Sequence, residues 1–169
     1  MRRGWWLGLI IAVGCQKAPN PAPNGTPPAV ASQIMENFDM IDTQNGQRNM
    51  TLHAAQAELF EEKHLAQLEK PDVVFLKQGK PSSRLVAPKG KVDTESHQME
   101  AWGGVTVTTV DSDTLTTERL QYDPKRNLIH TELPVHLVRP DSVTDGIGLE
   151  SDPGLQRIQI GHEKVRITK

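Results

Sequence analysis

Six histidines are the residues of this 169-residue chain best suited to metal chemistry. A metal site needs its ligands at short, defined spacings or with cysteine and carboxylate support, and no pair of these histidines has that spacing. Asp111 and Asp113 have the spacing of a calcium-loop fragment, but the glycine and the distal glutamate of such a loop are missing. We therefore expect no metal or other cofactor, and we interpret the histidines as surface residues: His53, His64, His97, His130, His136 and His162.

Catalytic motifs are absent from the sequence as well. No glycine-rich phosphate loop follows a strand pattern, and no serine stands in a nucleophile-elbow context. Lys and Arg number 19 against 21 Asp and Glu, so the net charge of −2 gives no basic field for a phosphate backbone. The sequence predicts a protein that is not an enzyme and does not bind nucleic acid.

Cys15 is the only cysteine, which excludes an internal disulfide. It follows two arginines and the apolar run 5–13, which is shorter than the ~20 residues that a spanning helix needs. This pattern is typical of a secretion signal. With Ala12 and Gly14 before the cysteine, it resembles the lipobox of bacterial lipoproteins, where signal peptidase II cuts before a cysteine that carries diacylglycerol. We predict a signal peptide over 1–14 and lipidation at Cys15; the alternative is a short uncleaved anchor with an incidental cysteine.

Residues 15–33 are rich in proline and poor in side chains that could be buried. Such a composition favours an extended, solvated segment. We interpret 15–33 as the lipidated cysteine and its tether, which would hold one folded domain, 34–169, away from a membrane surface.

Within 34–169 the apolar residues fall into short runs of period two that are rich in β-branched residues, as in 105–107 and 128–138. Period two indicates strands. Propensity alone would favour a helix over 52–68, which is rich in Ala, Glu, Gln and Leu. An internal repeat favours strands there too.

The repeat aligns Leu52, Leu85, Leu115 and Ile147, at spacings of about 30 residues. Each unit has an apolar strand, a break in alternation as at Pro88, and a second strand. Stacked units of this kind predict an all-β fold, a long antiparallel sheet folded over on itself. Aromatic residues make up only 4% of the chain, so the interior could be a lined, unfilled groove for lipid; the alternative is an ordinary packed sandwich core.

Four segments occur in an order that is specific to a known family: 85–92 (LVAPKGKV), 99–107 (MEAWGGVTV), 115–122 (LTTERLQY) and 129–135 (IHTELPV). With the tail 146–167, they resemble the LptC family of lipopolysaccharide export, which is related to LptA. The resemblance covers about residues 36–169. It implies a β-jellyroll, or folded β-taco, with a V-shaped hydrophobic cleft for the acyl chains of lipopolysaccharide.

The resemblance also implies partners and a place. An LptC-like protein takes lipopolysaccharide from an inner-membrane Lpt ABC transporter complex and passes it to an LptA-like bridge protein. Many members have an N-terminal transmembrane helix, which Cys15 would replace here as the membrane attachment. We therefore expect a periplasmic, lipid-anchored protein, at the inner membrane or, as an alternative, at the outer membrane.

Two groups of side chains are the candidate binding sites. Recurrent apolar positions are expected to face the acyl chains: Leu68, Trp102, Val105, Val107, Leu120, Tyr122, Val135 and Leu137. Alternating strands near the C-terminus would form an open sheet edge for the bridge protein: Ile158, Ile160, Val165 and Ile167. Two other functions remain open, a structural or adhesive surface lipoprotein that binds no lipid and a bridge-type scaffold that assembles end to end.

Overall fold

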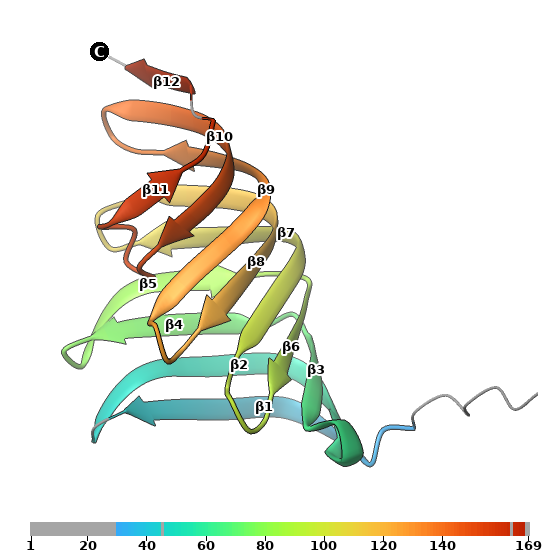
Figure 1. Ribbon diagram of the computed structural model, residues 1–169. Helices are drawn as coiled ribbons and strands as arrows, with labels where there is room; N and C mark the ends of the chain where they lie inside the picture. The colour runs from blue at the N-terminus through green and yellow to red at the C-terminus, as the bar shows by residue number, and fades with distance from the viewer. Residues whose placement is uncertain (1–29, 45, 163, 168–169) are drawn as a thin grey trace, which may run out of the picture.

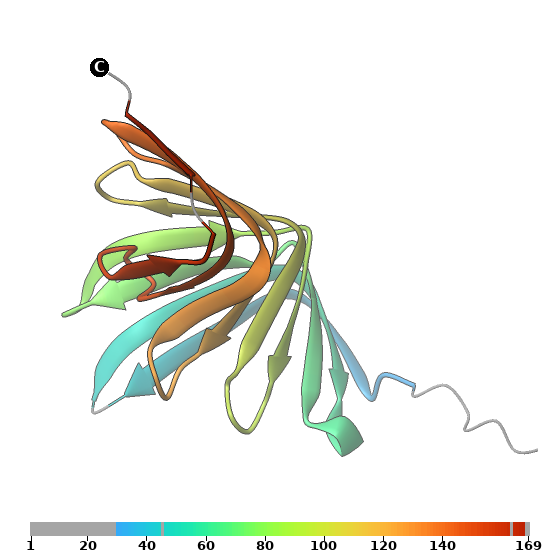
Figure 2. The same cartoon turned by 45° about the horizontal axis from the view of Figure 1, so that its top comes forward.

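The computed structural model describes residues 30–44, 46–162 and 164–167. Twelve antiparallel strands form one sheet that bends into two facing layers (Figures 1 and 2), as the all-β prediction requires. A single 3₁₀ turn, Glu61–Lys63, joins β2 and β3. The strands are β1 (Gln33–Gln44), β2 (Gln47–Phe60), β3 (Leu65–Glu69), β4 (Asp72–Lys77), β5 (Lys80–Val86), β6 (Lys89–Asp93), β7 (Met99–Thr109), β8 (Thr114–Asp123), β9 (Leu128–Val138), β10 (Ser142–Ser151), β11 (Ile158–Ile160) and β12 (Lys164–Ile167).

Each long strand contributes one half to each layer. The first half of β2 pairs with β4 and the second half with β3, while β7 pairs with β6 and then with β5. We call the two layers A and B. Layer A contains β3, β6, β11 and the strand halves 56–60, 99–102, 119–123, 128–131 and 149–151; layer B contains β4, β5, β12 and the halves 50–53, 105–109, 114–117, 135–138 and 142–147.

The corner between the layers is a line of breaks in the strand ladders. On β7 the break falls at Gly103 and Gly104, whose φ angles of 88° and 97° lie in the left-handed region that glycine adopts without steric cost. Similar register shifts interrupt the β8–β9 and β9–β10 pairings. Between β5 and β6 the corner lies at Ala87 and Pro88, where the repeat predicted it.

The helix-like segment 52–68 is strand, as the repeat predicted. Leu52, Ala54, Ala57 and Leu68 are all at most 2% exposed, and they point to the same side of the bent sheet. Burial of this face outweighs the weak helix propensity of the surrounding Ala, Glu and Gln residues.

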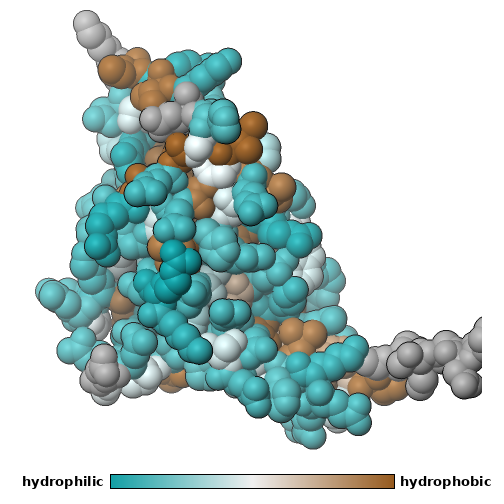
Figure 3. All heavy atoms as spheres, viewed as in Figure 1, coloured by the Kyte–Doolittle hydropathy of each residue, from teal (hydrophilic) through white to brown (hydrophobic). Residues whose placement is uncertain are grey.

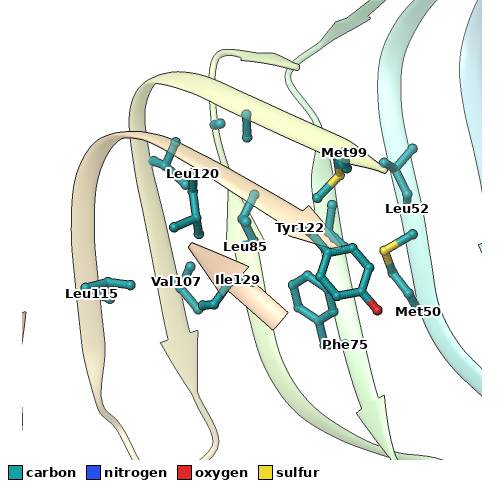
Figure 4. Close-up of a cluster of buried hydrophobic side chains, with 14 of the residues drawn as sticks. Met50, Leu52, Phe75, Leu85, Met99, Val107, Leu115, Leu120, Tyr122 and Ile129 are labelled. Atoms are coloured by element: carbon teal, nitrogen blue, oxygen red, sulfur yellow. The ribbon is translucent and has the colours of Figure 1, made fainter. Parts of the chain in front are cut away.

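The core lies between the two layers as one apolar cluster, whose side chains point toward each other from both layers (Figure 4). The repeat positions Leu52, Leu85 and Leu115 are at most 1% exposed. The fourth position of the alignment, Ile147, differs from these, because its side chain is 54% exposed. The register shift between Ile147 and Leu149 at the corner places Leu149 inside instead.

Candidate functional site

Seven of the eight predicted lipid-facing side chains line the interior of the folded sheet. Each is at most 4% exposed, so in this structure they pack against one another and fill the space between the layers. Layer A supplies Leu68, Leu120 and Tyr122, and layer B supplies Val105, Val107, Val135 and Leu137.

Trp102 is the exception, and its predicted position is wrong. Its neighbour Ala101 is fully buried, while Trp102 is half-buried on the outer face opposite Lys89 and Arg119. Successive side chains of a strand point to opposite faces. Residue 102 is therefore out of phase with Val105 on the same strand.

One aromatic contact joins the layers near the open side of the fold. The rings of Phe75 on β4 and Tyr122 on β8 meet edge to face, with centroids 4.9 Å apart. The Tyr122 hydroxyl donates a hydrogen bond to Asn127 Oδ1 at 3.3 Å. Burial raises the pKa of Tyr122 to about 12, and the nearby carboxylates of Asp42 and Asp123 add to this effect.

A polar contact joins the layers closer to the N-terminal end of the sheet. His97 Nδ1, in the turn before β7, lies 2.9 Å from Asp42 Oδ1 on β1. The Asp42 side chain is on the inner side, since the residue is only 8% exposed and pairs with buried Met50. This contact therefore connects the two layers at that end of the fold.

Leu155 is an interior residue that the sequence did not reveal. It lies in the connection between β10 and β11, in the sequence Asp-Pro-Gly-Leu-Gln, which is typical of an exposed turn. Yet it is 1% exposed and belongs to the apolar core. Its only sequence signal is one large apolar residue among turn formers.

The four predicted partner residues lie together at the C-terminal end of the sheet. Ile158 and Ile160 on β11 pair with Ser151 and Leu149, which are buried, so these isoleucines continue the inner face of layer A. On layer B, Val165 pairs with buried Thr144 in the same way.

Val165 and Ile167 on β12 are 55% and 82% exposed. No further strand pairs with the outer edge of β12 within the described part of the chain. The inner apolar surface therefore ends at an open edge, which could be extended by another strand.

The outer surface is polar. Figure 3 shows a mostly hydrophilic face, with hydrophobic atoms gathered toward the C-terminal end around β10 and β12. Ion pairs such as Arg119 with Glu100 connect neighbouring strands. The hydrogen bond from Arg84 lowers the pKa of Asp72.

Four of the six histidines, His53, His64, His97 and His136, lie close to a carboxylate oxygen. His53 lies 2.9 Å from Asp39 and His136 lies 2.6 Å from Asp145. His130 differs, because its Nδ1 is buried without a hydrogen-bond partner. In the regions that the structure describes, no three His, Cys, Asp or Glu side chains gather as a metal site would require.

The predicted signal peptide, Cys15 and nearly all of the tether lie outside the described residues. Among residues 30–44, 46–162 and 164–167, no helix is long and apolar enough to cross a membrane.

Comparisons with known proteins agree with this geometry. The family model described as "Lipopolysaccharide-assembly, LptC-related" matches residues 6–168. A similar solved structure is that of LptH from Pseudomonas aeruginosa, described as the LptA homologous periplasmic component of the conserved lipopolysaccharide transport device. The two chains are 14% identical in sequence, and the match covers 71% of this chain and 94% of that one with a TM-score of 0.54. This similarity supports the fold. No individual curated protein matches significantly. The chain belongs to the LptC-related family of lipopolysaccharide-assembly proteins.

Proposed function

We propose that this protein holds the acyl chains of lipopolysaccharide between its two layers during export. In this proposal it receives them from an inner-membrane Lpt ABC transporter complex and passes them to an LptA-like bridge in the periplasm. Cys15 would attach the protein to the membrane, with the inner membrane as the expected site. The protein would catalyse no reaction, because binding and hand-over need no bond to be made or broken in it.

The observation that carries this proposal is the continuity of the apolar interior. It runs from β1, where Phe38 and Met40 pack against the core, to Ile158 and Ile160 on β11 at the other end. A sealed sandwich would cover its last apolar side chains, whereas Ile167 is 82% exposed. An interior of repeated strands offers equivalent apolar positions, between which an acyl chain could move at little cost in free energy.

Strand phase provides a test in the full-length protein in cells. A photocrosslinking amino acid at Val105 or Val107, which point inward, should capture lipopolysaccharide. The matched controls are Thr106 and Thr108 on the same strand, whose side chains point outward and should capture little. Protease resistance of each variant would verify that it is folded.

Two outcomes would contradict the proposal. Equal capture of lipopolysaccharide at the inward positions, Val105 and Val107, and at the outward positions, Thr106 and Thr108, would mean that lipid does not enter the interior. Absence of capture at all four positions in folded variants would instead favour a structural or scaffold role without lipid transfer.

A further inference from the structure

Residues 152–157, which we call the mouth segment, cross the open side of the folded sheet. The segment leaves β10 in layer A and runs beside β4 and β5 of layer B (Figures 1 and 2). Ser83 Oγ donates a hydrogen bond to the Pro153 carbonyl at 2.6 Å, and Lys77 Nζ donates one to Gln156 Oε1, also at 2.6 Å. These contacts join the two layers at the side opposite the corner.

The mouth segment inserts one side chain into the core. Leu155 is 1% exposed and has a φ of 54°, in the left-handed region that side-chain-bearing residues adopt at a steric cost. Asp152 holds this turn, since its Oδ1 accepts hydrogen bonds from the backbone N–H groups of Gln156 and Arg157. The Leu155 carbonyl accepts a further hydrogen bond from Arg139 at 3.2 Å.

The mouth segment belongs to no strand ladder. Residues 152–157 lie between β10 and β11, so releasing them would break none of the strand pairings of either layer. Gln156 and Arg157 are exposed, and a hollow of about 90 Å³ beside the segment is lined by Phe75, Asn127 and Pro153. Phe75, which belongs to the apolar core, forms part of the lining of this hollow.

We propose that the mouth segment is a built-in plug of the lipid-binding interior. Leu155 occupies apolar space that an acyl chain takes when lipid binds, and the acyl chain enters from the open side as the segment moves out. The inference rests on the proposed function and adds the place of entry. It also explains why a strained leucine is buried in a polar turn, since Leu155 covers apolar surface while no lipid is present.

A disulfide lock tests whether the segment must move. A Cβ atom built on Gly154 lies 2.7 Å from Ser82 Oγ, a proximity compatible with the ~3.5–4.5 Å between Cβ atoms in a disulfide. The variant Ser82→Cys/Gly154→Cys is made in the full chain that carries the photocrosslinker at Val107. We expect the oxidised form to lose at least tenfold in lipopolysaccharide capture and to regain it on reduction.

The single variants Ser82→Cys and Gly154→Cys are the controls, and both should capture lipid whether oxidised or reduced. Equal capture by the locked and reduced double variant would overturn the plug while leaving the proposed function intact. If the parent protein with its crosslinker captures no lipopolysaccharide, the proposed function fails and the plug fails with it.

A second variant separates a plug from an ordinary core residue. Leu155→Ala should lower the stability of the protein and yet raise lipopolysaccharide capture severalfold, because the competing side chain is smaller. Leu115→Ala is the matched control, a fully buried leucine of β8 whose loss should lower stability without raising capture. A fall in capture for Leu155→Ala equal to that for Leu115→Ala would overturn the inference.

Discussion

At the scale of a single residue, the pKa of Tyr122 is a measure of how well water is excluded from the interior. It is the only tyrosine of the chain, so its ionisation can be followed by ultraviolet absorbance without interference from another phenol. Its side chain lies at the contact between the layers, where burial opposes formation of the phenolate. Any opening of the layers that admits water should therefore move the pKa of Tyr122 back toward 10.

We predict that the folded protein loses stability in alkali through this residue. A pKa raised from 10 to about 12 means that the folded state holds the phenol proton more tightly than the unfolded state. The contribution of Tyr122 to the free energy of unfolding is complete below pH 10 and is lost as the pH rises toward 12. The loss amounts to at most roughly 3 kcal/mol. Urea unfolding at a series of pH values measures it.

Tyr122→Phe is the control for this prediction. It should flatten the dependence of stability on pH in the alkaline range, although it also removes the hydrogen bond to Asn127. An absorbance titration of the wild-type protein with a midpoint near pH 10 would show that the phenol is not held in the apolar interior.

At the scale of the elements, the sequence predicts the strands and the corners correctly. It predicts only in part which side chains of each strand point into the core. Period two and the repeat correctly place Leu52, Leu85 and Leu115 in the core and predict strands over the helix-like segment 52–68. Ile147, aligned with these leucines by the repeat, is exposed because a register shift beside Gly148, whose φ is 80°, changes the phase of β10. A shift of one residue exchanges the inward and outward side chains in the rest of the strand, and no residue type by itself marks the position of such a shift.

The burial of Leu155 shows a different limit of sequence reasoning. Its neighbours specify a turn, and the structure has that turn. Its position across the open side depends on contacts with Ser83 and Lys77, each at least 70 residues away in sequence. Such distant contacts are set by the folding of the whole sheet and leave no local pattern.

Asp145 of β10 is a side-chain contact of β12. Its carboxylate receives a hydrogen bond from His136 and an ion pair from Arg166 of β12, and these contacts hold the pKa of Asp145 below its usual value of 3.8. Because its pKa is lowered in the folded state, Asp145 stabilises the fold above pH 3.8, and this stabilisation is lost as the pH falls through the lowered pKa.

We predict that Asp145→Asn loosens β12 at neutral pH, because it removes the charge that pairs with Arg166. Amide hydrogen exchange should become severalfold faster in β12 and stay unchanged in β4 and β5. Asp141→Asn is a control, since Asp141 is an exposed carboxylate immediately before β10, the strand that carries Asp145. Unchanged exchange in β12 of Asp145→Asn would show that backbone pairing with β10 alone holds this strand.

The open end of the sheet is expected to be the docking site for the bridge protein. Truncation after Gly161 removes β12 and its exposed Val165 and Ile167, while Ile158→Pro removes a backbone donor from β11. Both changes should leave the other strands folded, as circular dichroism would verify. Each should abolish capture of an LptA-like partner in a pull-down experiment.

Val165→Ser is a finer change at this edge, and we expect it to weaken partner capture about tenfold. Val110→Ser is its matched control, since Val110 is 68% exposed in the turn between β7 and β8, away from the sheet edge. Undiminished capture by the folded truncated protein would mean that the bridge docks elsewhere.

At the scale of the whole molecule, the described domain is separated in sequence from the predicted lipid attachment at Cys15. Among the residues that the structure describes, the twelve strands lie between Gln33 and Ile167, and the apolar core begins at Met35. The predicted tether would place this domain tens of Å from the membrane, since proline-rich chains extend by ~3.1 Å per residue. The bent sheet could then remain folded and accept lipid whether or not Cys15 carries an anchor.

We therefore predict that Cys15→Ser abolishes lipid attachment without changing the stability of the domain. The variant should fail to incorporate radioactive palmitate and should retain residues 1–14, while its urea unfolding midpoint stays that of the wild-type domain. Two or more acyl chains give a stable attachment because each buried methylene contributes ~0.8 kcal/mol, so the label should follow the membrane fraction of the wild-type protein. Palmitate incorporation by Cys15→Ser, or wild-type protein that keeps Met1 to Gly14, would show that the protein reaches its membrane by another route.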